Sequence, residues 1–212
     1  ILIGTGDRDA GDAPGLGVYV SLDGGWSWGV SNTGMSNKTV GKIIQHPANS
    51  SVFLAATSGG VYRSSDGGAS WSLSISGNFK DICFKPNDPA IVYATKSSDF
   101  YRSGDNGISF SQITNGLTTG QRGAIGVTEA NANYVYFVQS NNSSGFKGLY
   151  RSTDAGLSFT TMSTSPNILD WSCGGTGGGG QGWYDLAIAV DPTNAETLYI
   201  GGINVWKSTN GG

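Results

Sequence analysis

The chain has 212 residues, of which 37% are hydrophobic and 13% are charged, and its formal net charge is -3. This composition is that of a folded protein of one or two domains, and it excludes a disordered chain and a basic nucleic-acid-binding protein. No apolar run approaches the roughly 18 residues that cross a bilayer, so we expect no membrane insertion. Glycine is unusually frequent, at 35 residues, which predicts many tight turns.

Short strands separated by turns are predicted along the whole chain, starting at its first residues. Residues 40–75 show the pattern best, with four strand-like segments separated by clusters of Gly, Asn, Asp and Ser. The same order of four strands recurs twice, and shorter units of three strands stand at both ends. The predicted fold class is therefore all-β. The predicted units are residues 1–30, 40–75, 80–113, 123–162 and 184–212.

A motif of the form Ser-x-Asp-x-Gly-x-Ser-Trp/Phe recurs in these units. Its third position is occupied by Asp23, Asp66, Asp105, Asp154 and Asn210. The spacings of 43, 39, 49 and 56 residues are typical of propeller blades. We expect the Asp or Asn to accept hydrogen bonds within a turn, the Gly to adopt a positive φ and the aromatic ring to pack between sheets. The motif therefore predicts a structural role.

Radial repetition of four-stranded antiparallel sheets is typical of a β-propeller. We therefore predict four to five blades of a propeller. The first unit begins at its second strand, and the last one ends inside the motif. On this basis we expect these residues to be a segment of a larger ring or of a longer protein. The covalent continuation of the same polypeptide is then expected to pack against this segment.

The repeated motif resembles that of the Asp-box, or BNR-repeat, propellers over essentially the whole chain. This family includes sialidases, the luminal domain of sortilin and xyloglucan-cleaving glycoside hydrolases. The short segments at residues 4–7 and 191–194 most resemble recurring segments of secreted bacterial repeat proteins. The resemblance implies a bacterial protein that is secreted or displayed on the cell surface. It also implies a ligand-binding face opposite the motif turns, built from the long loops at residues 4–17, 31–39, 114–123, 140–148 and 163–183.

Three functions are considered at this point, and one of them, an assembly factor analogous to propellers that chaperone membrane complexes, would need a basic or apolar interaction patch that the composition does not indicate. The first is a non-catalytic propeller module that binds a glycan or a protein through its long-loop face and requires no cofactor. The alternative is a glycoside hydrolase of the xyloglucan-cleaving or sialidase type, which needs paired carboxylates. Candidate catalytic carboxylates are Asp7, Asp170 and Asp185.

A sialidase would also need arginines that converge on the substrate carboxylate. Arg63, Arg102 and Arg151 occupy one equivalent position in three units, each within Tyr-Arg-Ser. Repetition at one position of the unit indicates a scaffold role.

Candidate ligand-binding residues lie in the Gly-rich segment 163–183 and just after it. Trp171, Trp183 and Tyr184 form either a stacking platform for a sugar or peptide, or a cover over the hydrophobic centre.

Three further features concern metals, thiols and the single histidine. The carboxylates of Asp7, Asp9 and Asp12 are candidate calcium ligands, and a solvated acidic loop is the alternative reading. Cys83 and Cys173 either form a disulfide or are one buried and one exposed thiol. The one histidine, next to Pro47, is expected to be structural.

Overall fold

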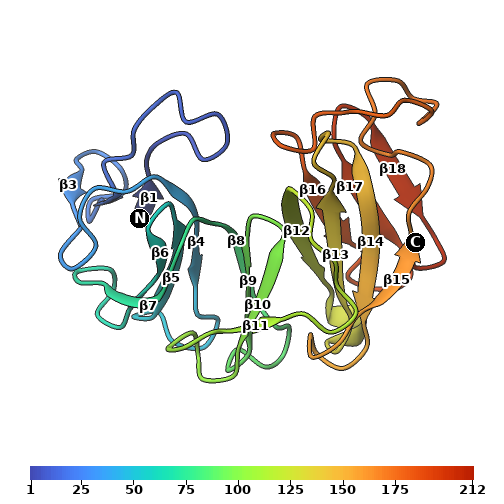
Figure 1. The fold of residues 1–212 in the computed structure, drawn as a ribbon. Helices are drawn as coiled ribbons and strands as arrows, with labels where there is room; N and C mark the ends of the chain where they lie inside the picture. The colour runs from blue at the N-terminus through green and yellow to red at the C-terminus, as the bar shows by residue number, and fades with distance from the viewer. The chain divides into compact units, whose positions relative to one another are not determined.

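The computed structural model describes residues 1–212 and contains 18 β-strands and one short 3-10 helix, η1 (Glu129–Asn131) (Figure 1). The all-β prediction is confirmed. Along the chain, three strands of the first sheet are followed by twelve strands in three sheets and by three strands of the last sheet, which is the predicted order. None of the protein's helical structure is long and apolar enough to cross a membrane.

Five antiparallel sheets follow one another along the chain, and in each sheet the strands are paired in sequence order. The first sheet comprises β1 (Leu2–Gly4), β2 (Val18–Val20) and β3 (Gly29–Val30). The second comprises β4 (Val40–Gln45), β5 (Phe53–Thr57), β6 (Gly60–Ser64) and β7 (Ser72–Ser76). The third comprises β8 (Phe79–Phe84), β9 (Val92–Lys96), β10 (Asp99–Ser103) and β11 (Ser111–Ile113). The fourth comprises β12 (Arg122–Val127), β13 (Val135–Ser140), β14 (Phe146–Ser152) and β15 (Thr160–Ser163). The fifth comprises β16 (Ala187–Val190), β17 (Leu198–Gly201) and β18 (Val205–Ser208).

The middle strands of the four-stranded sheets are the most apolar. β5 reads Phe-Leu-Ala-Ala-Thr, and β13 reads Val-Tyr-Phe-Val-Gln-Ser with every residue buried. Such near-continuous apolar runs form strands that are covered on both faces. The fourth strand β7, by contrast, consists of exposed and half-buried residues, three of which are serines.

The chain forms two compact units, each with its own hydrophobic core. The first unit comprises Ile1–Phe84, Pro89–Ala94 and Ser103–Phe110, and the second comprises Lys85–Asp88, Thr95–Arg102 and Ser111–Gly212. One core cluster of the first unit contains Val18, Met35, Val40, Ala55, Tyr62 and Trp71. A core cluster of the second contains Ala124, Tyr136, Val138, Phe146, Leu149, Leu169, Leu186, Leu198 and Ile200.

The motif turns are closed by the hydrogen bonds that the sequence predicts. At Asp66, the hydroxyl of Ser64 donates to Oδ1 at 2.7 Å, and the backbone N–H of Ser70 donates to the same oxygen at 2.9 Å. The Ser70 hydroxyl donates to Oδ2 at 2.5 Å, and the Gly68 N–H donates to the Ser64 hydroxyl at 2.8 Å. Asp23, Asp105 and Asp154 make the same contacts. At Asn210 the amide oxygen accepts from the Ser208 hydroxyl at 2.8 Å.

The residue after each motif Asp adopts a left-handed conformation. Gly24 and Gly67 have φ values of 78° and 77°, and Asn106 and Ala155 have φ values of 60° and 58°. Glycine and asparagine enter this region readily, whereas alanine does so at a cost of about 1–2 kcal/mol. The hydrogen bonds of the turn therefore override the local preference of Ala155.

Two of the three repeated arginines link a motif turn to the sheet that precedes it. Arg63 donates its Nε hydrogen to the carbonyl of Asn106 at 3.1 Å, and Arg102 donates to the carbonyl of Ala155 at 2.9 Å. Arg151 pairs with the carboxylate of Glu196 at 2.8 Å. Each guanidinium therefore serves a structural contact, and the three do not form a carboxylate-binding triad.

The motif aromatics differ in burial. Trp71 is buried, and its Nε1 hydrogen is donated to the carbonyl of Ser31 at 2.8 Å. Phe159 is also buried and packs against Phe100, with ring centroids 4.8 Å apart. Trp28, in contrast, remains 39% exposed, and its indole N–H bonds to Gly25 of its own turn. The expected packing between sheets is therefore seen at Trp71 and Phe159 and not at Trp28.

We predict that the fold loses stability in acid, because the pKa values of the motif carboxylates are lowered. Burial raises the pKa of Asp154, but hydrogen bonds from Ser158 and Ser152 lower it by more, to about 2. Bonds from Ser70 and then Ser64 lower the pKa of Asp66, also to about 2. A depressed pKa in the folded state gives stability that is present above the unfolded value near 3.8 and is lost as pH falls through the folded value.

We therefore expect the urea midpoint of unfolding to fall as the pH is lowered from 4 to 2. Asp154→Asn, which copies the natural Asn210, should keep the bond to Ser152 and show a smaller loss over this interval. Equal pH dependence in the variant and the wild type would contradict this role of the Asp154 carboxylate.

Candidate functional site

The Gly-rich segment between β15 and β16 is organised by Asp170. This carboxylate is buried and accepts hydrogen bonds from the backbone N–H groups of Trp171 at 2.8 Å and Gly177 at 2.7 Å. The Ser172 hydroxyl donates to it at 2.9 Å. These bonds, that from Gly177 above all, lower the pKa of Asp170. Asp170 is thus an ionised anchor of the loop, whereas a general acid in glycoside hydrolysis needs a raised pKa.

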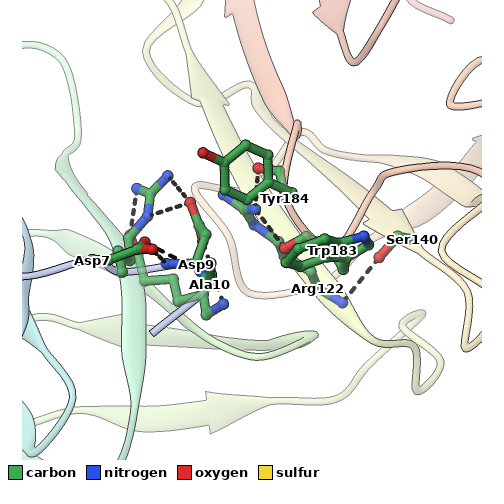
Figure 2. Close-up of polar contacts among 9 residues, drawn as sticks. Asp7, Asp9, Ala10, Arg122, Ser140, Trp183 and Tyr184 are labelled. Atoms are coloured by element: carbon green, nitrogen blue, oxygen red, sulfur yellow. Dashed lines mark hydrogen bonds and ion pairs between the residues drawn. The ribbon is translucent and has the colours of Figure 1, made fainter. Parts of the chain in front are cut away.

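A buried arginine holds the end of the same segment. Arg122, the first residue of β12, is 4% exposed. Its Nη1 donates to the backbone carbonyls of Trp183 at 2.8 Å and Tyr184 at 2.5 Å, as Figure 2 shows. Its backbone N–H donates to the hydroxyl of Ser140 at 3.2 Å. Hydrogen bonds to a charged donor are among the stronger ones in proteins, so Arg122 fixes the backbone at both aromatic residues.

Arg122 is a residue that the sequence did not single out. It lies outside the repeated Tyr-Arg-Ser position, between Gln121 and Gly123 at the start of a strand. The sequence signal that could have identified Arg122 is its place outside the repeat, at the start of a buried strand.

The candidate aromatic side chains are accessible. Trp171 is 58% exposed, Trp183 is 41% exposed and Tyr184 is 46% exposed. The rings of Trp183 and Tyr184 lie next to each other, with centroids 5.2 Å apart and planes inclined by 48°. Leu169 of this segment and Leu186, just after it, are buried in the core cluster of the second unit. All three aromatic residues are therefore accessible from solvent.

The loop between β1 and β2 has a different chemistry. The carboxylate of Asp7 accepts from the backbone N–H groups of Asp9 at 2.8 Å and Ala10 at 3.1 Å, and these bonds lower its pKa (Figure 2). Asp9 pairs with Arg8 at 3.0 Å and with Lys80 at 3.3 Å. Together with neighbouring residues they line a cavity of about 240 Å³.

The calcium prediction gains no support from this loop. Asp12 is exposed, and Asp7 and Asp9 direct their carboxylates to the contacts just described. No group of three or more acidic, His or Cys side chains is placed to hold a metal ion.

The remaining candidates are Asp185, the two cysteines and the single histidine. Asp185 follows Tyr184 and is half-buried, and its backbone N–H donates to the carbonyl of Gln181 at 2.9 Å. Both cysteines are free thiols: Cys173 is exposed, and burial raises the pKa of Cys83 to about 12. His46 accepts from the backbone N–H of Ala48 at 3.1 Å, as a turn residue does.

Comparison with known proteins defines the fold. No family model and no curated protein matches the sequence. The structure is similar to that of a GH74 enzyme from Niastella koreensis, with a TM-score of 0.73 and 16% identity, over 99% of this chain and 34% of that one. It is also similar to a GH74 xyloglucanase from Xanthomonas campestris, with a TM-score of 0.69 and 15% identity, over 99% of this chain and 34% of that one.

A third similar structure is the extracellular domain of a one-component system, BT4673, from B. thetaiotaomicron. The TM-score is 0.53 and the identity 12%, over 84% of this chain and 21% of that one. The chain thus spans about a third or less of the length of these proteins. Their shared architecture, together with the four-stranded antiparallel sheets, shows that the protein is a β-propeller module.

Proposed function

We propose that this module is a non-catalytic glycan-binding propeller whose contact surface is formed by Trp171, Trp183 and Tyr184. The observation that carries the proposal is the combination of exposed rings with a fixed backbone. Trp183 and Tyr184 present their side chains to solvent while the buried Arg122 holds both of their carbonyl groups.

Preorganised aromatic rings suit a carbohydrate ligand. A pyranose ring has apolar C–H faces that can cover an exposed aromatic ring and remove its area from water. Because the backbone of the Trp183–Tyr184 pair is already ordered, binding loses less conformational entropy than it would on a mobile loop. The Gly-rich backbone beside the rings offers N–H and C=O groups to sugar hydroxyls.

The repeated Asp turns support membership of the Asp-box propellers, and the long-loop surface is where that group would present its ligand site. The similarity to a GH74 xyloglucanase makes β-glucan-based oligosaccharides, xyloglucan fragments first, the probes of choice. The similarity to an extracellular bacterial domain supports a secreted or surface-displayed bacterial protein.

Hydrolysis is the less supported function. Backbone hydrogen bonds lower the pKa values of both Asp7 and Asp170. The bond from the N–H of Asp9 has the largest effect on Asp7, and the bond from the N–H of Gly177 has the largest effect on Asp170. Both groups therefore stay ionised at neutral pH and do not supply the proton that a glycosidic leaving group needs. A binding role uses neither group as an acid.

Calorimetric titration with xyloglucan oligosaccharides tests the proposal. Trp183→Ala should weaken binding about tenfold, because an aromatic contact contributes about 1.5 kcal/mol. Trp26→Ala is the matched control, since Trp26 is 91% exposed on a motif turn, and it should bind like the wild type. Equal affinity of Trp183→Ala and the wild type, or no binding across a panel of neutral and acidic oligosaccharides, would contradict the proposal.

A further inference from the structure

An asparagine followed by a glycine is a place where a protein can modify itself. Asparagine is among the chemically labile residues, and the backbone nitrogen of a following glycine can attack its side-chain amide carbon, because no Cβ shields that nitrogen. The sequence contains three such pairs, Asn106-Gly107, Asn115-Gly116 and Asn210-Gly211. The structure places their backbone nitrogens in different surroundings.

Two of the three glycine nitrogens are engaged in hydrogen bonds. The N–H of Gly107 donates to the hydroxyl of Ser103 at 2.9 Å, and Gly107 is buried inside its motif turn. The N–H of Gly211 donates to the carbonyl of Glu196 at 2.8 Å. Each nitrogen has to give up this bond before it can attack the neighbouring amide, and a buried polar group left without a partner is unfavourable.

The third pair is open to solvent. Asn115 and Gly116 are both exposed, and neither the N–H of Gly116 nor the side-chain amide of Asn115 takes part in a hydrogen bond. They are the central residues of a turn between β11 and β12, which is closed by the N–H of Leu117 donating to the carbonyl of Thr114 at 3.1 Å. The nitrogen that would react is therefore free, and water and hydroxide can reach it.

The same turn makes a contact that such a reaction would disturb. The carbonyl of Asn115 accepts the N–H of Phe159 at 3.0 Å, and a Cβ on Gly116 would overlap with the Phe159 carbonyl. Phe159 is the buried motif aromatic of the fourth sheet, and its ring packs against Phe100. The main chain at residues 115 and 116 therefore has no room for an additional atom.

We propose that Asn115 is a site of spontaneous deamidation that weakens this contact. The Gly116 nitrogen loses its proton to hydroxide and bonds to Cγ of Asn115, and the side-chain nitrogen leaves as ammonia. Water then opens the cyclic imide at either of its carbonyl carbons. Opening at Cγ gives aspartate. Opening at the backbone carbonyl gives isoaspartate, in which the main chain runs through Cβ and Cγ and is longer by one methylene group.

Peptide mapping by mass spectrometry tests the site in the full 212-residue chain, incubated at mildly alkaline pH. We expect the amide of Asn115 to convert to an acid at least about fivefold faster than that of Asn106, the factor that corresponds to one broken hydrogen bond. The chain unfolded in guanidinium chloride is the control, and the two amides should react at similar rates there. Equal rates in the folded chain, a faster reaction at Asn106 or no reaction at Asn115 would overturn the proposal.

A second measurement tests the effect on the fold. The modified chains carry an additional negative charge, so ion exchange separates them from the unmodified chain. Their isoaspartate should lower the urea midpoint of unfolding, because the carbonyl that accepts the Phe159 N–H has left the main chain. Asn115→Asp is the matched control, since it adds the same charge without lengthening the main chain, and it should keep the midpoint of the wild type. Equal midpoints of the isoaspartate form and Asn115→Asp would contradict the proposed weakening.

Discussion

Trp71→Ala is expected to lower the free energy of unfolding by about 3–5 kcal/mol, the range for removing a large buried aromatic side chain. Trp71 is 3% exposed and belongs to the core cluster that includes Val18 of the first sheet and Tyr62 of the second. Its loss leaves a void at that contact and removes the hydrogen bond to the Ser31 carbonyl. Urea unfolding followed by circular dichroism measures the change.

The same experiment on Trp26→Ala provides the comparison. Trp26 precedes the motif serine Ser27 and is almost fully exposed. Its replacement should change the free energy of unfolding by less than about 0.5 kcal/mol, as is usual for surface positions. Similar losses in the two variants would show that burial against the neighbouring sheet is not what makes Trp71 stabilising.

Gly116→Ala is expected to be about as damaging, through the backbone rather than through a side-chain contact. Gly116 has a φ of 77°, where an L residue is strained, and a Cβ there would overlap with the backbone carbonyl of Phe159. Strain of this kind costs about 1–3 kcal/mol, and the overlap cannot be relieved by a side-chain rotation. We expect a loss of about 3 kcal/mol at least, measured by urea unfolding.

Gly178→Ala is the matched control for this substitution. A Cβ at Gly178 meets no atom within 4 Å, and its φ lies outside the left-handed region. Alanine there should be neutral or slightly stabilising, because it reduces the freedom of the unfolded chain. A Gly116→Ala protein as stable as Gly178→Ala would contradict the close approach of the Phe159 backbone.

The strands and turns could be predicted from the sequence because each repeats a local chemical requirement. The serines and the aspartate of the motif at Asp66 satisfy each other and the turn backbone within the seven residues from Ser64 to Ser70, so no distant contact is needed to specify the turn. The middle strands have an equally local signal, since β13 begins with the continuous run Val-Tyr-Phe-Val.

The candidate site was less predictable because its geometry depends on residues far apart in the chain. Asp170 looked like a possible catalytic carboxylate, and only the folded loop reveals that Gly177 and Ser172 occupy its oxygens. Arg122 acts on Trp183 from 61 residues away. Trp28 and Trp71 occupy the same motif position, yet only Trp71 is buried in a core cluster.

The most direct test of glycan binding by the aromatic surface observes the tryptophan side chains themselves. Each of the six tryptophans has one indole N–H, so a nitrogen-proton correlation spectrum during titration with xyloglucan oligosaccharides reports on each ring. We predict saturable shifts of the Trp171 and Trp183 signals, with those of Trp26 and Trp71 unchanged. Shifts at Trp26 with Trp183 unaffected, or a spectrum that does not change at all, would contradict it.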